Sequence, residues 1–156
     1  MPQSAIRSFN GNKLREIRKA RGLSLAELGR QARIHANLIS NWERGVHHPS
    51  DQGLIDTLAV LQADLFSVLD TPRNRANLTE LRVDNRFTRD DLAEELGVSR
   101  TAWTNIERGM NAPSADKMER LVEIFQLPAS TPAQLRNSLN MIRDAWEITH
   151  DQYYGT

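Results

Sequence analysis

The sequence predicts an all-α protein built from two similar modules. Shifting the 156-residue chain against itself by 64 places lays residues 41–45, NWERG, onto residues 105–109, NIERG, without a gap. Apolar residues recur at helical spacing within each copy, between N-cap residues and glycine stops, and this pattern indicates short α-helices. Further identical pairs in register are Leu14/Leu78, Glu16/Glu80, Arg18/Arg82 and Leu28/Leu92. We therefore expect two tandem copies of one small helical domain.

The clearest helical pattern lies in residues 87–109, FTRDDLAEELGVSRTAWTNIERG. Thr88 is expected to cap a first helix, and Gly97 to end it, because glycine adopts a left-handed conformation without steric cost. Ser99 is then expected to cap a second helix. The inward residues are expected to be Leu92, Ala93 and Leu96 on the first helix, and Ala102, Trp103 and Ile106 on the second.

The outward residues of this second helix are polar or cationic, and they are Arg100, Thr101, Thr104, Asn105 and Arg108. Such side chains hydrogen-bond base edges and hold phosphates. Arg100 is the best candidate for a bidentate contact with guanine, and Asn105 for a contact with adenine. We expect Arg108 to contact phosphate.

These residues resemble the helix-turn-helix of the Cro/repressor-like family, also called the XRE family. The turn glycine, the Val-Ser entry and the Ile-Glu-Arg-Gly ending all occur in register. The resemblance implies two tandem five-helix, lambda-repressor-like domains, each with a third helix that enters the major groove of DNA.

The first copy is expected to span residues 10–70. Ser24 and Glu27 form a capping box, and Arg33 stands where the second copy has its turn glycine. Residues 34–44 are the predicted recognition helix, with Leu38, Ile39 and Trp42 expected on its buried side. Its predicted DNA contacts are Asn37, Ser40, Asn41 and Arg44, with Asn41 suited to adenine. A fourth helix through Leu54, Leu58 and Leu61 and a short fifth through Leu65, Phe66 and Leu69 are expected to follow.

A linker is expected at residues 71–77, followed by the second copy at 78–149. This copy departs from the first after its fourth helix, where Thr131 and Pro132 begin an extended C-terminal helix. An apolar stripe with coiled-coil spacing follows at Leu135, Leu139, Ile142 and Trp146. The stripe predicts a homodimer interface. The alternative is that it folds back over the second copy's own core at Met118, Val122 and Phe125.

Composition argues against most other chemistries. The chain has no cysteine, and its net charge is zero, with +2 on residues 1–70 and −2 on residues 71–156. His47 and His48 lack a nearby third zinc ligand, and no catalytic or phosphate-loop motif occurs. We expect no enzyme activity, metal or cofactor. The N-terminus lacks a signal-peptide core and no apolar run could span a membrane, so we expect a cytoplasmic protein.

The two copies together predict a sequence-specific regulator that binds double-stranded DNA, acting as a repressor that occludes a promoter. The alternative is an antitoxin-like or adaptor protein in which one copy, more plausibly the first, binds a protein partner. The polar outward set and the Arg-Gly ending in both copies favour DNA binding by both.

Overall fold

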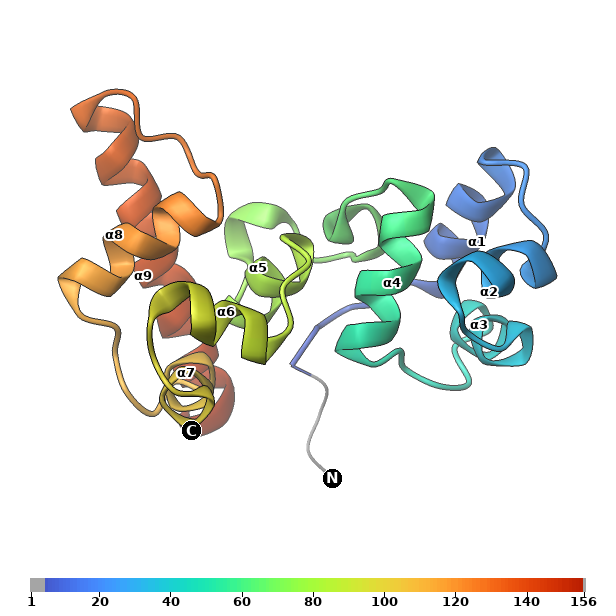
Figure 1. Ribbon diagram of the computed structural model, residues 1–156, viewed down its shortest axis with the longest axis horizontal. Helices are drawn as coiled ribbons and strands as arrows, with labels where there is room; N and C mark the ends of the chain where they lie inside the picture. Colours follow the sequence, from blue (N-terminus) through green and yellow to red (C-terminus); the bar gives the residue numbers. More distant parts are fainter. Residues whose placement is uncertain (1–4, 156) are drawn as a thin grey trace. The chain divides into compact units, whose positions relative to one another are not determined.

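The computed structural model describes residues 5–155 (Figure 1). These residues form two compact units, and the boundary between the units along the chain lies between Pro72 and Arg73. Within the described residues the regular elements are helices, and extended pairing is limited to one isolated bridge between Phe9 and Leu69. The predicted all-α fold with two domains of similar design is confirmed.

From residue 5 onward, the first unit contains four α-helices and a short 3₁₀-helix. They are α1 (Gly11–Ala20), α2 (Leu25–Ala32), α3 (Ala36–Glu43), α4 (Asp51–Leu61) and η1 (Leu65–Val68). Helix α2 packs against α3 and α4, while α1 packs against α3 and η1. The expected fifth helix therefore exists as one turn of 3₁₀-helix, with Leu65 and Val68 on its buried side.

Local sequence signals begin and end these helices as predicted. The Ser24 hydroxyl accepts from the Glu27 amide at 3.0 Å, and the Glu27 carboxylate accepts from the Ser24 amide at 3.3 Å, which completes the capping box. Arg33 ends α2 in the left-handed conformation, with φ 60°. The turn thus needs a positive φ in both copies, although only the second has glycine there.

The chain ends of the first unit pair with each other. The Asn10 amide donates to the Val68 carbonyl and the Asp70 amide donates to the Ser8 carbonyl, both at 2.8 Å. The hydrogen bond from the Asn10 side chain, followed in size by the one from Lys13, lowers the pKa of the Asp70 carboxyl. The unit accordingly includes Ser8 and Phe9, ahead of the expected domain start at residue 10.

The second unit begins with a 3₁₀ turn and contains five α-helices. They are η2 (Arg73–Arg75), α5 (Leu78–Asp84), α6 (Arg89–Leu96), α7 (Arg100–Glu107), α8 (Ala115–Ile124) and α9 (Pro132–Tyr154). Figure 1 shows α9 running beside α8 and reaching α7, and α9 also contacts α5 and η2. The later part of the expected linker is thus structured, since Asn77 caps α5 and its side chain donates to Gln152 at 2.9 Å.

Helix α9 buries a different face from the one predicted for a homodimer. The residues buried along it are Ser138, Ile142, Ala145 and Thr149. Leu135, Leu139 and Trp146, by contrast, are only half-buried. The small residues let α9 approach closely, and the Thr149 hydroxyl accepts a hydrogen bond from the first amide of α5, that of Leu78, at 3.1 Å.

The structure does not support Leu135, Leu139, Ile142 and Trp146 as a homodimer stripe. Ile142, its central residue, has no exposed surface and packs inside the second unit. The Trp146 indole donates to the Asn111 carbonyl at 2.9 Å, in the loop after α7. The alternative of folding back over the unit's own helices describes α9, which packs against α5, α7 and α8.

Near its C-terminal end, α9 passes unusually close to the end of α7. His150 Nδ1 donates to the Gly109 carbonyl at 2.7 Å. A Cβ atom on Gly109 would lie 2.4 Å from the His150 Cα, whereas one on Gly45 at the equivalent place in the first unit would meet nothing within 4 Å. Gly109 is thus required by close approach as well as by its positive φ of 77°.

These two glycines make a matched test of the packing of α9. Gly45→Ala should cost about 1–2 kcal/mol, the usual cost of a left-handed residue with a Cβ. Gly109→Ala should cost roughly 1–3 kcal/mol more, because the backbone of α9 must move. Urea unfolding of both variants measures the difference, and equal losses of stability would contradict the close approach.

Candidate nucleic-acid interface

A buried ion pair holds the predicted recognition helix of the first unit. Arg18 on α1 meets Glu43 at the end of α3 in a bidentate contact, with Nε–Oε2 at 2.7 Å and Nη2–Oε1 at 2.9 Å. Arg18 Nη1 also donates to the Leu23 carbonyl at 2.9 Å. The hydrogen bond to Glu43 raises the pKa of the guanidinium, which stays charged. Because both groups are rigid and paired, they fix α3 against α1.

The second unit repeats this pair 64 residues later. Arg82 on α5 contacts Glu107 at the end of α7 through Nε and through Nη2, the latter at 3.4 Å, and Arg82 Nη1 donates to the Phe87 carbonyl at 2.9 Å. Arg89 adds a second cation, with Nε 2.7 Å from Glu107 Oε2. Sequence reasoning missed these pairs, although the aligned Arg and Glu residues were a signal for them.

The outward face of α3 carries the residues predicted to contact DNA. Asn37 and Arg44 are exposed, while Ser40 and Asn41 are half-buried. Arg44 folds back along the helix, with Nη2 2.6 Å from Asn41 Oδ1 and Nε 3.4 Å from Ser40 Oγ. The structure brings these three side chains into one hydrogen-bonded cluster, with Asn37 apart from it toward the start of the helix.

Leu38 is a correction to the predicted buried side of α3. Its side chain is 40% exposed, whereas Ile39 and Trp42 are buried. Leu38 precedes Trp42 by four residues and is about 100° of helical rotation from Ile39, so it stands at the edge of the buried face. Its exposed part therefore borders the candidate DNA contacts.

The outward face of α7 has a more cationic set. Arg100, Thr101 and Arg108 are exposed, and Thr104 and Asn105 are half-buried. Arg100 Nε lies 3.3 Å from Asp90 Oδ1, and both side chains are about two-thirds exposed. Exposed pairs of this kind contribute little free energy, so Arg100 can exchange Asp90 for another acceptor at small cost.

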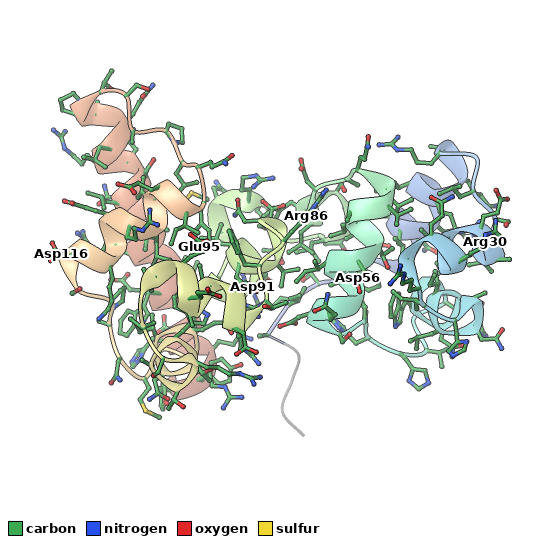
Figure 2. The ribbon with its side chains drawn as sticks, in the orientation of Figure 1. Arg30, Asp56, Arg86, Asp91, Glu95 and Asp116 are labelled. Atoms are coloured by element: carbon green, nitrogen blue, oxygen red, sulfur yellow. The ribbon has the colours of Figure 1, made fainter. Side chains whose placement is uncertain are left out.

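The acidic residues of α6 lie at the surface of the second unit. Figure 2 shows Asp91 and Glu95 extending from this helix, and Asp90 and Glu94 are exposed as well. Glu95 Oε2 lies 3.7 Å from Arg120 on α8. The arrangement fits solvated charges at a helix surface, as expected from the divergent directions of neighbouring helical residues.

The two tryptophans of the aligned helices belong to the core. Trp42 is 2% exposed and Trp103 has no exposed surface. The prediction that both pack inward is confirmed. Their burial leaves the polar side of each helix as the surface available to a ligand.

The loop histidines form no metal site in the part of the chain described. His47 and His48 are exposed, and His48 Nδ1 lies 3.1 Å from the Pro49 carbonyl. Residues 5–155 hold no group of three or more His, Cys, Asp or Glu side chains that could share a metal ion.

Comparison with protein families gives two matches to one model, described as a helix-turn-helix domain, at residues 11–65 and 75–135. Together these regions cover well over half of the sequence. The chain belongs to the helix-turn-helix family. Neither the curated proteins nor the solved structures gave a match.

Each matched region contains two helices that are joined by a tight turn and packed together. They are α2 and α3 in the first region, and α6 and α7 in the second. Most of α9 lies beyond the second matched region and so is an addition to the motif. Helix-turn-helix domains indicate a DNA-binding regulator. None of the helices described has both the length and the apolar character needed to cross a membrane.

Two substitutions test the first recognition helix. Asn41→Ala and Arg44→Ala should each weaken specific DNA binding while changing the thermal midpoint little, because neither side chain is part of the core. Arg44→Ala should also reduce the slope of log affinity against log salt by about one unit, as expected when one phosphate contact is lost.

Fluorescence anisotropy across a salt series measures both effects. Thr57→Ala is a useful contrast, because Thr57 is buried on α4 and should alter stability but not the salt slope. A large loss of stability from Asn41→Ala would show that α3 is turned differently about its axis.

Proposed function

We propose that the protein is a transcriptional repressor of the Cro/repressor-like branch, which binds a specific double-stranded DNA site and excludes polymerase by occupying the promoter. The observation that carries this proposal is the repeated arrangement of each domain. In both, a buried Arg–Glu pair fixes a recognition helix whose outward side is polar or cationic. Rigid presentation of such side chains is what major-groove reading requires.

In this proposal the two domains divide the contacts in a similar way. Arg44 and Arg108 follow their recognition helices at equivalent positions and hold phosphates. The base-reading residues are Asn37, Ser40 and Asn41 in the first domain, and Arg100, Thr101, Thr104 and Asn105 in the second. Because the two sets differ at most positions, one chain reads an asymmetric site. The protein would act in the cytoplasm, where it meets its promoter.

Selection of binding sites from a random duplex library tests the proposal. The intact chain should enrich one sequence, and that sequence should form a gel-shift complex that weakens steeply as salt rises. The double variant Arg44→Ala/Arg108→Ala should lose most of this binding. Failure to enrich any sequence at low salt would refute the proposed function.

Arg100 is predicted to read guanine in the second domain. Arg100→Ala should weaken binding to the selected site by roughly 1–3 kcal/mol and relax the preference at one base pair. Repeating the selection with the variant shows which position changes. Arg86→Ala, a change at an exposed cation outside the recognition helix, is the control for a general loss of positive charge. An equal loss on all sequences would make Arg100 a phosphate contact.

A second candidate function is an antitoxin-like or adaptor role, in which the first domain binds protein. The observation that favours it is the exposure of Leu38 and Val46, which are 40% and 54% exposed on α3 and in the loop that follows it. In that case Asn41→Ala and Arg44→Ala would leave DNA binding intact, while Arg100→Ala would still impair it.

A further inference from the structure

The two recognition helices, α3 and α7, differ in their first helical turn, at the start of the face proposed to read DNA. Where α7 places Arg100 and then the small Ala102, α3 places the small Ala36 and then the larger Leu38, at positions related by the 64-residue repeat. Leu38 is 40% exposed and Ala102 is half-buried. The first residue of the helix is therefore the cation Arg100 in the second domain and the small Ala36 in the first, whose exposed aliphatic side chain is Leu38, two residues later.

No cation lies within α3 itself. Its eight residues, ANLISNWE, contain no lysine, arginine or histidine. The nearest cation along the chain toward the C-terminus is Arg44, and its guanidinium lies over Asn41 and Ser40 at the end of the helix. Within α3 itself, the start of the face therefore presents the Asn37 amide beside the exposed aliphatic side chain of Leu38, and the exposed His35 and Arg33 precede the helix.

Base pairs differ in the side chains that match their major-groove edges. Guanine presents two acceptors to the major groove and is matched by arginine, whereas thymine presents a C5-methyl group that is matched by an apolar side chain. Adenine, the partner of thymine, is matched by asparagine. An aliphatic residue flanked by asparagines thus has the chemistry of an A·T reader.

We propose that Leu38 is a specificity-determining residue that contacts a thymine C5-methyl group, so that the first domain recognises an A·T-containing half-site. The second domain, led by Arg100, recognises a half-site containing guanine. This inference rests on the proposed function and names the base composition of its DNA site.

The surroundings of Leu38 favour DNA over a protein partner. Polar side chains border it on the same helix, with Asn37 on one side and Asn41 one turn later. A stable protein interface buries about 800 Å² on each partner and has an apolar centre. Even together with Val46, a leucine bordered by amides is too small an apolar surface for such a centre, and it is better matched to one methyl group.

The test combines a change in the DNA with a change in the protein. In the site selected by the intact chain, each thymine of the first half-site is replaced in turn by deoxyuridine, which lacks only the C5-methyl group. At one position this should weaken binding of the natural protein about four-fold, the value of one buried methyl group. With Leu38→Ala the same replacement should have no effect.

A control variant makes the result specific. Ala102→Gly, at the equivalent position of the second domain, should leave the deoxyuridine effect in the first half-site unchanged. If Leu38→Ala fails to fold, the deoxyuridine scan of the natural protein still decides whether a thymine methyl group in the first half-site contributes to binding.

The inference is overturned if the first half-site contains no thymine, if no deoxyuridine weakens binding, or if the effect persists with Leu38→Ala. Those outcomes leave the proposed function intact, because a specific site was found. A first domain that protects no base pairs in a footprint would also overturn the inference and would favour a protein partner for Leu38. If no site is selected at all, the proposed function fails and this inference fails with it.

Discussion

Glu107→Ala is expected to destabilise the second domain by about 3–5 kcal/mol, the usual cost of removing one partner from a buried ion pair. The side chains of Glu107 and Arg82 are each only 1% exposed, so the variant would leave a guanidinium buried without its carboxylate. Arg89, which also pairs with Glu107, would lose its acceptor too. The end of α7 would then no longer be fixed against α5.

The equivalent change in the first domain is the matched control. Glu43→Ala leaves only Arg18 without its carboxylate, and the side chain of Arg18 is 9% exposed, so water can reach it more readily. We expect a smaller loss there, confined to the first domain. Amide hydrogen exchange followed residue by residue separates the two domains and measures both losses. Equal losses in both domains would show that Arg89 contributes nothing to the second pair.

Ile142→Ala is expected to cost about 2–5 kcal/mol, because it removes buried methyl groups and leaves a cavity. Ile142 has no exposed surface and lies on the face of α9 that covers α5, α7 and α8. The loss should appear in the second domain, as a lower urea midpoint for its unfolding. Leu135→Ala should cost much less, since Leu135 is half-buried near the start of the same helix.

Sedimentation of the same variants separates packing within the domain from packing between chains. If Ile142→Ala converts a dimer into a stable monomer, with no loss in the urea midpoint, the residue belongs to an intermolecular interface and the fold of α9 described above is wrong. Loss of stability that does not depend on protein concentration supports packing within the domain.

Local chemistry was sufficient to predict the ends of most helices. Ser24, Thr88, Ser99 and Thr131 cap helices as expected, because an N-cap needs only a side-chain oxygen and the next turn of its own chain. Gly97 ends α6 with φ 76° for an equally local reason. The repeat of 64 residues supplied the rest, since two copies of one pattern predict two copies of one domain.

The faces of the helices were decided by tertiary structure. Apolar spacing pointed to Leu135, Leu139 and Trp146 on α9, yet Ser138, Ala145 and Thr149 face the core with Ile142. A hydrophobic pattern picks out large apolar side chains. A helix packed closely over three others instead needs small side chains, because these let the backbones approach. Leu38 was misplaced for a related reason, because three apolar residues crowd a short helix and only Ile39 and Trp42 find space in the core.

The most important part that the sequence left undetermined is the support of the candidate site. Arg18 and Glu43 are 25 residues apart, and charged residues are expected at the surface unless a partner is known. Folding brings α1 against the end of α3 and removes both groups from water, and only then does their pairing become favourable. The sequence by itself thus indicated the polar residues that could face DNA, and the packing of the domain decided which helix faces are exposed and what holds them in position.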